Sequence, residues 1–441
     1  MWLRPAESLA CQRICVSIAR RRLIFTRDGI KASRPVAVPV FHDSSRTMFS
    51  LIETAKIAKA MLLKDRPLYV QFYITARCNL ACQQCNIIYA NSDVREATLD
   101  EIKKIADNLA EIGTCVVLLT GGEPFARADL PEIIRAFNER HIHVRMQTNG
   151  LATEDALAAA VEAGGHDISI SLDTLVGSKQ DYLNGEVNNS WAKAIKAMST
   201  VTRILPKKNS FAALGCVLSH RNLHDVANVL RFARRIGWHV SLVPAHIAQP
   251  HDPRGFRSYD QSLVFPPEKY PALEAEIENL KGMKAAGYPL YDSTIYLDDI
   301  VNFIEHKPLK WRSRNDGVCD APALYFTIIP NGDMAVCCDH RLSQRISTFA
   351  PEFPRQYAQR VTHQHVLPIT RACDGCLYGS YPEISTTARF FSAMWDHAKI
   401  LLASTRLEKN WPIAAEDMFA IADEILAEHP PVDQPAELSP V

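Results

Sequence analysis

The sequence of 441 residues predicts an α/β protein, in which a partial (β/α)6 barrel of the TIM type is followed by a small α+β region with a β-hairpin. Three observations predict this fold. Strand-like and helix-like segments alternate six times between residues 66 and 245. A fully apolar run such as Cys115–Thr120 is typical of a parallel strand that is buried on both faces. Beyond the alternation, Asn331-Gly332 separates two apolar runs and is a strong hairpin signal.

Each expected strand of the barrel is rich in apolar residues and is followed by a segment with helical periodicity. The capping box Thr98–Glu101 opens the first helix that follows a strand. The expected strands are 68–75, 115–120, 143–147, 167–172, 211–218 and 239–244. The expected helices are 48–64, 98–112, 130–140, 153–164, 190–204 and 222–236. Right-handed crossovers place these helices outside a curled sheet, and ligands of such sheets bind at the carboxyl ends of the strands.

The alternation stops after Pro244, and the second half of the chain follows a different pattern. The expected elements are a loop at 246–266, helices at 268–286 and near 298–305, hairpin strands at 325–330 and 333–338, and a helix at about 387–402. The tail after Pro430 is proline-rich and is expected to be disordered. The expected domains are therefore a leader (1–47), the barrel with an N-terminal amphipathic helix (48–245), a helical connector (246–316), an α+β region (317–405) and a C-terminal helix and tail (406–441).

Charge and hydropathy exclude two classes of protein. Lys and Arg together number 49 and so do Asp and Glu, so the chain lacks the basic excess of a dedicated nucleic-acid binder. No apolar run reaches the roughly 18 residues of a membrane-spanning helix.

The Arg-rich leader is either a transit-like segment or a stretch upstream of the true start, which is Met1 or Met48. The amphipathic segment 48–64 is expected to pack on the barrel, and a peripheral membrane contact stays open.

Cysteine placement gives the first indication of chemistry. The twelve cysteines stand at positions 11, 15, 78, 82, 85, 115, 216, 319, 337, 338, 373 and 376. Clustered cysteines in a long chain with amphipathic helices are read first as metal ligands rather than disulfides. Metal-binding thiols need to be reduced, so we expect a cytoplasmic location.

The first cysteine cluster follows the first expected strand. Cys78, Cys82 and Cys85 have the spacing C-x3-C-x2-C on one tight loop. Three thiolates can hold three irons of a cubane cluster, which leaves the fourth iron without a protein ligand, unlike the four-cysteine clusters of electron carriers. An open coordination position is what a metal site needs in order to bind a substrate directly.

The second strand ends in Thr120-Gly121-Gly122-Glu123-Pro124, next to the cysteine loop. Two glycines let the backbone approach a ligand closely. The Glu123 carboxylate is an acceptor suited to an ammonium group. The pair of motifs, on consecutive strands, therefore indicates a cluster site with an adjoining ligand site.

On these motifs, residues 66–245 resemble the radical S-adenosylmethionine (SAM) enzymes. The resemblance implies a [4Fe–4S] cluster on Cys78, Cys82 and Cys85, whose open iron is chelated by the amino and carboxylate groups of SAM. It implies that Glu123 and the backbone of Gly121 and Gly122 hold the SAM amino group. Asn149 and Ser171, which end the third and fourth strands, match family positions near the SAM ribose, the SAM carboxylate or the substrate. The sequence departs from the family at Gln84, where an aromatic residue usually precedes the third cysteine.

Four later cysteines form a second expected site. Cys319, Cys337 on the hairpin, and the pair Cys373-x-x-Cys376 supply four thiolates, which suit a ribbon-like zinc site. Behind a radical SAM barrel their order resembles the SPASM/twitch auxiliary-cluster domains, and this resemblance implies a second [4Fe–4S] cluster. Alternation along the strand puts Cys337 and Cys338 on opposite faces, so only one of them can face the site.

The resemblance implies reductive cleavage of SAM to a 5′-deoxyadenosyl radical that abstracts hydrogen from an unactivated C–H bond. The expected outcome is oxidation, cross-linking or rearrangement of a peptide, metabolite or lipid-like substrate, with electrons from a flavodoxin- or ferredoxin-type donor. The alternative is a non-catalytic iron–sulfur protein that transfers electrons or senses redox state. The open iron and the Gly-Gly-Glu-Pro motif speak against that alternative, because an electron carrier has no use for a SAM site.

Overall fold

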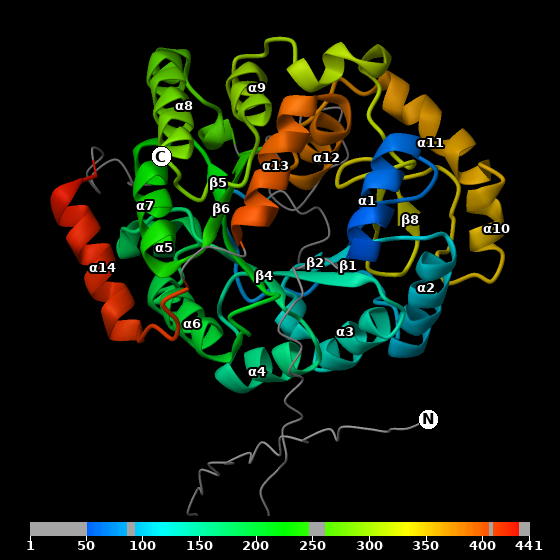
Figure 1. Ribbon diagram of the computed structural model, residues 1–441, viewed down its shortest axis with the longest axis horizontal. Helices are drawn as coiled ribbons and strands as arrows, with labels where there is room; N and C mark the ends of the chain where they lie inside the picture. Colours follow the sequence, from blue (N-terminus) through cyan, green and yellow to red (C-terminus); the bar gives the residue numbers. More distant parts are fainter. Residues whose placement is uncertain (1–50, 86–92, 247–260, 405–408, 432–441) are drawn as a thin grey trace, which may run out of the picture. The chain divides into compact units, whose positions relative to one another are not determined.

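The computed structural model describes residues 51–85, 93–246, 261–404 and 409–431 (Figure 1). All of these belong to one compact unit, Arg46–Val441. The expected leader, the alternative start positions and the last ten residues of the tail lie outside the described residues.

One sheet of eight strands organises this unit, in the order β6-β5-β4-β3-β2-β1-β7-β8. The first six strands pair in parallel and in sequence order, which confirms the predicted partial barrel. They are β1 (Tyr69–Thr75), β2 (Val116–Gly121), β3 (His143–Thr148), β4 (Asp167–Ser171), β5 (Phe211–Leu218) and β6 (His239–Pro244). Most residues of β1, β2 and β5 are buried on both sides of the sheet, as expected of apolar parallel strands, whereas only alternate residues of β3 are buried.

Helices follow one another around the outside of the sheet (Figure 1). They are α1 (Leu51–Leu63), α2 (Leu99–Glu111), α3 (Leu130–Asn138), α4 (Glu154–Glu162), α5 (Gly177–Leu183), α6 (Ser190–Ile204) and α7 (Val226–Ile236). The capping box of α2 is confirmed, because the Thr98 hydroxyl accepts from the Glu101 N–H and the Glu101 carboxylate accepts from the Thr98 N–H. Helix α5 was not predicted.

Aromatic packing joins the helices to the outer face of the sheet. Phe72 of β1 lies edge-on to Phe137 of α3, with 6.5 Å between the ring centroids. Both side chains are fully buried. Burial of each contributes roughly 1.5–3 kcal/mol to the stability of this contact layer.

The predicted hairpin is confirmed, and it joins the barrel sheet. Strands β7 (Tyr325–Ile328) and β8 (Met334–Ala335) pair antiparallel on either side of Asn331-Gly332. β7 also pairs in parallel with β1, with Tyr69 opposite Tyr325. The hairpin therefore extends the sheet at the edge that carries the cysteine loop. Local sequence signals predict a hairpin but do not say which distant edge it joins.

The rest of the C-terminal half is helical. It contains α8 (Tyr270–Ala285), α9 (Thr294–Ile304), α10 (Phe353–Ala358), α11 (Val361–Ala372), α12 (Ser380–Arg389), α13 (Phe391–Ser404) and α14 (Ala415–Glu428). The helix expected at about 387–402 is observed as α13, which begins at Phe391 because extended backbone at Phe390 separates it from α12. Helix α12 was not predicted. Helices α10 and α11 were not predicted. No helix in the described part of the chain is both long enough and apolar enough to cross a bilayer.

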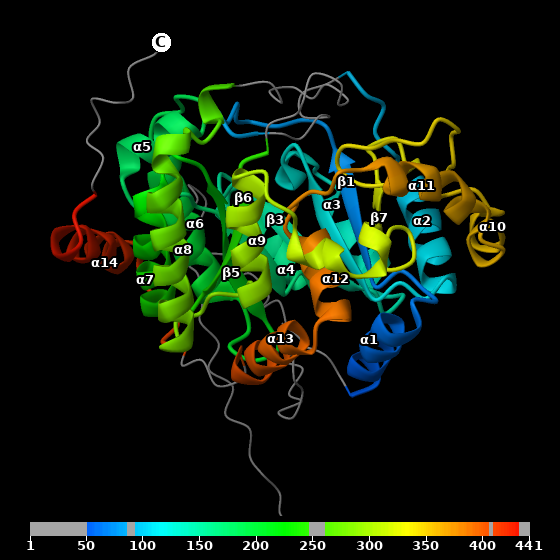
Figure 2. The same ribbon diagram turned by 90° about the horizontal axis from the view of Figure 1, so that it is seen from above.

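Figure 2 separates the two ends of the barrel. The arrow of β1 points to the end that carries the cysteine loop. Helices α1 and α13 project from the opposite end, where the strands begin, which we call the strand-start end.

Candidate active site

The cysteine loop leaves the end of β1 and is fixed at its base by Glu96. This carboxylate accepts hydrogen bonds from the Thr75 hydroxyl and from the Ala76 N–H, the latter at 3.2 Å. It also forms a two-point ion pair with Arg77, with N···O distances of 3.0 and 3.2 Å. The chain is therefore held in a defined direction just before Cys78. No sequence motif pointed to Glu96.

Gly121 and Gly122 hold the end of β2 against this loop. The Gly122 N–H donates to the Thr75 carbonyl at 2.9 Å. A Cβ atom on Gly121 would lie 2.3 Å from the Thr75 carbonyl oxygen, and one on Gly122 would lie 2.2 Å from that of Arg77. The motif was expected to let the backbone approach a ligand. In this structure the close approach that requires glycine is to the neighbouring strand, which positions the cysteine loop.

Glu123 follows directly and is almost completely buried, with 2% of its surface exposed. Its carboxylate accepts from the Phe125 N–H at 3.1 Å, the Thr148 hydroxyl at 2.8 Å and the Asn149 N–H at 2.8 Å. Burial raises the pKa of Glu123 to about 7, against the opposing effect of these hydrogen bonds. Among the described residues no lysine or arginine contributes to that pKa. A buried carboxylate of this kind has room for a cationic partner.

Asn149 connects the cysteine loop to the third strand. Its side-chain N–H donates to the Asn79 amide oxygen at 2.7 Å, while its backbone N–H donates to Glu123. Ser171 is half-buried and is the last residue of β4, at the same end of the sheet. The predicted ligand-site residues Glu123, Asn149 and Ser171 therefore end three neighbouring strands.

The three thiols of the loop lie close enough to influence one another. Burial raises the pKa of Cys78 to about 11, and the charges of Glu123 and Cys85 raise it further. Burial raises the pKa of Cys82 more strongly, with the charges of Cys85, Asp173 and Cys78 acting in the same direction. Three thiolates would repel one another here unless cations compensated their charge. The donor set therefore fits an iron–sulfur cluster, whose irons supply that compensation.

Helix α5 and the turn after it hold the other side of the loop. The Gln83 N–H donates to the Leu183 carbonyl at 2.8 Å. Gly185 has φ +88°, and a Cβ atom there would lie 2.4 Å from the Ala81 carbonyl oxygen. The Cys82 thiol lies 3.8 Å from the Asn184 amide oxygen. Sequence reasoning missed this contact because it did not predict α5.

Gln84 and Asp173 link the cysteine loop to the end of β4. The Gln84 side-chain N–H donates to an Asp173 carboxylate oxygen at 2.5 Å. The other oxygen of Asp173 accepts from the Val217 N–H at 2.7 Å. Burial raises the pKa of Asp173 to about 6. At the position where the sequence departs from the family pattern, Gln84 thus makes a hydrogen bond to the segment that follows β4.

The four later cysteines line one small cavity next to the hairpin. Cys319, Cys337, Cys373 and Cys376 line it together with Trp311, His340 and Tyr381. Burial raises the pKa of Cys319 to about 11 and that of Cys376 well above its usual value. The pKa of Cys373 is lowered although burial opposes this, because His340 hydrogen-bonds its sulfur. The donors gathered here fit a metal cluster with four thiolate ligands.

Cys338 faces away from this cavity, so the structure distinguishes it from Cys337. The Tyr73 hydroxyl donates to the Cys338 sulfur at 3.1 Å, and the Gln71 amide oxygen lies 3.9 Å from that sulfur. Both contacts are to side chains of β1, and Cys338 is not among the residues that line the four-cysteine cavity. The hairpin strand expected at 333–338 ends at Ala335, so Cys337 and Cys338 lie in a bend beyond β8 and strand alternation does not account for the difference between them.

Within the described ranges, no three His, Cys, Asp or Glu side chains converge closely enough to hold a single metal ion. That finding concerns single-ion sites, whereas in a cubane each thiolate binds a different iron.

The fold and the three-cysteine loop define an α/β barrel protein with an iron–sulfur ligand set at the carboxyl ends of its strands. The model of the Radical SAM superfamily matches residues 72–233, from within β1 to within α7. Residues 72–233 therefore form a radical SAM domain, which is the part of the chain that the family model covers.

Curated relatives match the barrel part of the chain. The AdoMet-dependent heme synthase of Methanosarcina barkeri is 28% identical over 207 residues, which cover 46% of this chain and 58% of that protein. The PqqA peptide cyclase of Bradyrhizobium diazoefficiens is 31% identical over 169 residues, 38% of this chain and 43% of that protein. The chain thus spans about half the length of the curated relatives it matches.

The fold likeness continues beyond the barrel. The crystal structure of Streptococcus suis SuiB bound to S-adenosylmethionine has a TM-score of 0.52 at 16% identity, and the match covers 78% of each chain. This share is larger than residues 69–244 alone, so it includes part of the C-terminal half. At this identity the likeness concerns the fold.

Proposed function

We propose that the chain is a radical SAM enzyme that abstracts hydrogen from an unactivated C–H bond of a peptide substrate. The observation that carries this proposal is the contact between the three-cysteine loop and the strand that ends in buried, uncompensated Glu123. When bound, the cluster and SAM supply an electron and a 5′-deoxyadenosyl radical. The residues of this chain hold these groups, orient them and exclude water.

Cys78, Cys82 and Cys85 would hold the cluster. The Leu80 N–H lies 3.4 Å from the Cys78 sulfur and donates to it, which favours the thiolate form. Asn184 lies beside Cys82, and Glu96 holds the base of the loop. These contacts support ligation by three protein thiolates, with one iron left for SAM.

Glu123 would bind the amino group of SAM. Its carboxylate uses three acceptor positions for donors of the chain, and a carboxylate offers about four. The amino group of SAM, whose nitrogen would bind the open iron through its lone pair, can therefore donate an N–H to the remaining position and offset a charge that burial makes costly. Asn149 and Ser171, at the neighbouring strand ends, are proposed to contact the rest of SAM or the substrate.

Cys319, Cys337, Cys373 and Cys376 would hold a second [4Fe–4S] cluster. Support comes from their shared cavity and from the likeness to SuiB, which extends into this half of the chain. His340 keeps the Cys373 sulfur ready for ligation by lowering its pKa. An auxiliary cluster near the barrel can accept the electron that remains on the substrate after hydrogen abstraction, which suits an oxidation or a cross-link.

A peptide is the substrate class that the comparisons favour. The name of the PqqA peptide cyclase states a peptide substrate for that relative, and its matched part is the barrel. We further propose a flavodoxin- or ferredoxin-type electron donor and a cytoplasmic location, as the reduced thiols require.

The test is anaerobic reconstitution, measurement of iron and sulfide per chain, and assay of 5′-deoxyadenosine after addition of dithionite and SAM. The proposal predicts about eight irons and formation of 5′-deoxyadenosine. Eight irons without SAM cleavage, also in the presence of a strong reductant and candidate peptides, would favour the electron carrier. About four irons with one zinc would show that the second site is a zinc site.

A further inference from the structure

Large apolar side chains are exposed mainly at one end of the molecule. Seven are exposed among the described residues, and five of these lie on α1 or α13. They are Leu62, Leu63, Phe391, Met394 and Trp395. Leu62 is 80% exposed and Phe391 is 73% exposed. Exposed apolar residues are ordinary when scattered, but a concentration on two neighbouring helices marks an interaction surface.

Helix α13 presents its apolar stripe to solvent. Phe391, Met394 and Trp395 stand at positions i, i+3 and i+4, which share one face of a helix. Ala393 and His397 are buried and attach the opposite face to the protein. The usual arrangement, in which the apolar stripe faces the core, is thus reversed for this helix.

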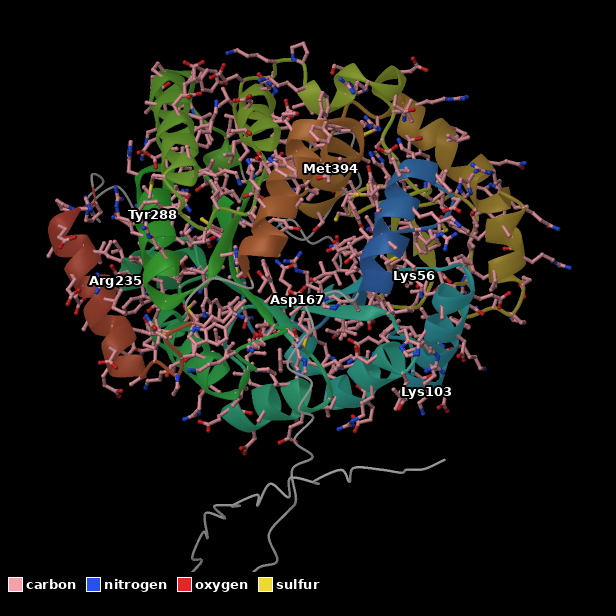
Figure 3. The ribbon with its side chains drawn as sticks, viewed as in Figure 1. Lys56, Lys103, Asp167, Arg235, Tyr288 and Met394 are labelled. Atoms are coloured by element: carbon pink, nitrogen blue, oxygen red, sulfur yellow. The ribbon has the colours of Figure 1, made fainter. Side chains whose placement is uncertain are left out.

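Both helices flank the strand-start end of the barrel. They border one cavity of about 160 Å³, to which α1 contributes Ile57 and Met61 and α13 contributes His397. Figure 2 shows the two helices projecting from that end, away from the cysteine loop. Figure 3 labels Lys56 on α1 and Met394 on α13, and Asp167 of β4, which lines the same cavity, lies below Met394 and to the left of Lys56 in this view. The exposed apolar residues therefore belong to a single surface, which we call the α1–α13 face.

Basic groups surround this face. Lys56, Arg66 and Arg140 line a hollow beside α1, which also contains Glu111. Arg66 is paired with Asp65, and Arg140 with Asp107. On α13, the Lys399 ammonium lies 5.8 Å from the centre of the Trp395 ring. The chain that leads into α1 is strongly basic, since residues 1–50 contain nine Lys or Arg against three Asp or Glu.

We propose that the α1–α13 face binds the surface of an anionic lipid bilayer. Phe, Trp, Leu and Met are the side chains that enter the interface, and lysine and arginine beside them attract anionic headgroups. Phe391, Trp395 and Leu62 would insert, while Lys56 and Lys399 would contact headgroups. The cysteine loop lies at the other end of the barrel, so its mouth stays open to substrate on the bound protein. This inference does not depend on the proposed function.

The test is flotation of the full-length protein with vesicles of phosphatidylglycerol and phosphatidylcholine. A double variant, Phe391→Ser with Trp395→Ser, removes the exposed stripe without touching the core. The matched control is Val264→Ser with Leu367→Ser, which removes two exposed apolar side chains elsewhere. We expect the wild type and the control to float, and the bound fraction of the stripe variant to fall about tenfold.

Four results would overturn the proposal or its assignment of an anionic surface. One is no flotation of the wild type, and another is equal flotation of the stripe variant. The third is a wild-type dimer, seen in sedimentation, that the stripe variant converts to a monomer, because the face would then bind a second copy of the chain. Equal flotation with pure phosphatidylcholine vesicles would overturn the assignment of an anionic surface. Weakening of flotation by high salt would support it.

Discussion

The Glu123 carboxylate accepts a hydrogen bond from the Thr148 hydroxyl at 2.8 Å, and so joins the end of β2 to the end of β3 beside the cysteine loop. The same carboxylate is buried without a cationic partner among the described residues. Glu123 thus links two strand ends by a hydrogen bond, and its carboxylate charge is not compensated by a cation among the described residues. The proposed SAM site follows from this combination.

Glu123→Gln is expected to weaken SAM binding while the cluster stays in place. The amide keeps the shape of the side chain and can still accept from Thr148, but it lacks the charge that strengthens the hydrogen bond from the amino N–H of SAM. Loss of a charge-assisted hydrogen bond of this kind costs about 1.5–3 kcal/mol, which is a tenfold or larger loss of affinity. Titration calorimetry of the reconstituted protein measures this affinity for SAM. Glu162→Gln on the exposed surface of α4 is the control, and equal affinities in the two variants would contradict the prediction.

SAM affinity is expected to rise with pH between about 6 and 8, because the pKa of Glu123 is raised to about 7. Below this pKa the carboxylate is protonated and is a weak acceptor for the amino N–H of SAM, whereas above it the charged form accepts strongly. The Glu123→Gln variant should lack this increase. Measurement of the SAM dissociation constant at several pH values decides the matter, and a flat profile in the wild type would exclude Glu123 as the partner of the SAM amino group.

Folding stability should show the opposite trend at the same residue. The folded-state pKa of Glu123 lies above its unfolded value, so this group stabilises the fold most below pH 4.5 and loses that stabilisation as pH rises toward 7. The difference between the folded and unfolded pKa values corresponds to about 3 kcal/mol of folding stability. Denaturant unfolding of the cluster-free protein at several pH values measures this change in the free energy of unfolding. The part of the pH dependence that is due to Glu123 should vanish in Glu123→Gln, and a persisting slope would assign it to other groups.

Gly185→Ala is expected to loosen the cysteine loop. Gly185 and Gly287 both have positive φ, so alanine costs about 1–2 kcal/mol at either position. Only at Gly185 would the new Cβ also overlap the Ala81 carbonyl, at 2.4 Å, whereas nothing lies within 4 Å at Gly287. The rate of iron loss to a chelator should therefore rise about tenfold more in Gly185→Ala than in Gly287→Ala. Equal rates would mean that the turn after α5 does not support the cluster.

The adjacent pair Cys337 and Cys338 gives a matched test of the second site. Cys337→Ala should lower the iron content from about eight to about four per chain, because it removes one of four ligands. Cys338→Ala should retain the iron, because that sulfur faces Tyr73 rather than the cavity. Iron analysis and electron paramagnetic resonance check both variants. Loss of iron in Cys338→Ala alone would reverse the assignment.

The barrel and its cysteines were predictable because the signals are local. Apolar runs, the Thr98 capping box and the Asn331-Gly332 turn each determine an element within a few residues. The contacts around the cysteine loop were not predictable, because they join residues that are far apart in the sequence. Glu96 and Asn184 contact the loop only because β1 and α5 bring them there, and Gln84 is interpretable only once Asp173 is seen to accept from it.

The roles of two motifs also changed in the structure. Gly121 and Gly122 were expected to approach a ligand, yet their backbone packs against Thr75 and Arg77. The hairpin was expected as part of a separate region, yet β7 adds to the barrel sheet beside β1. In both cases the sequence predicts the local conformation, whereas tertiary packing determines which segment of the chain the element contacts.

The most direct test of the central claim is the electron paramagnetic resonance spectrum of the reduced cluster on Cys78, Cys82 and Cys85, with and without SAM. A Cys337→Ala background removes the overlapping signal of the second cluster. The account predicts that SAM shifts the spectrum, and that Glu123→Gln requires a tenfold or higher SAM concentration for the same shift. A spectrum that SAM leaves unchanged at saturating concentration would contradict it.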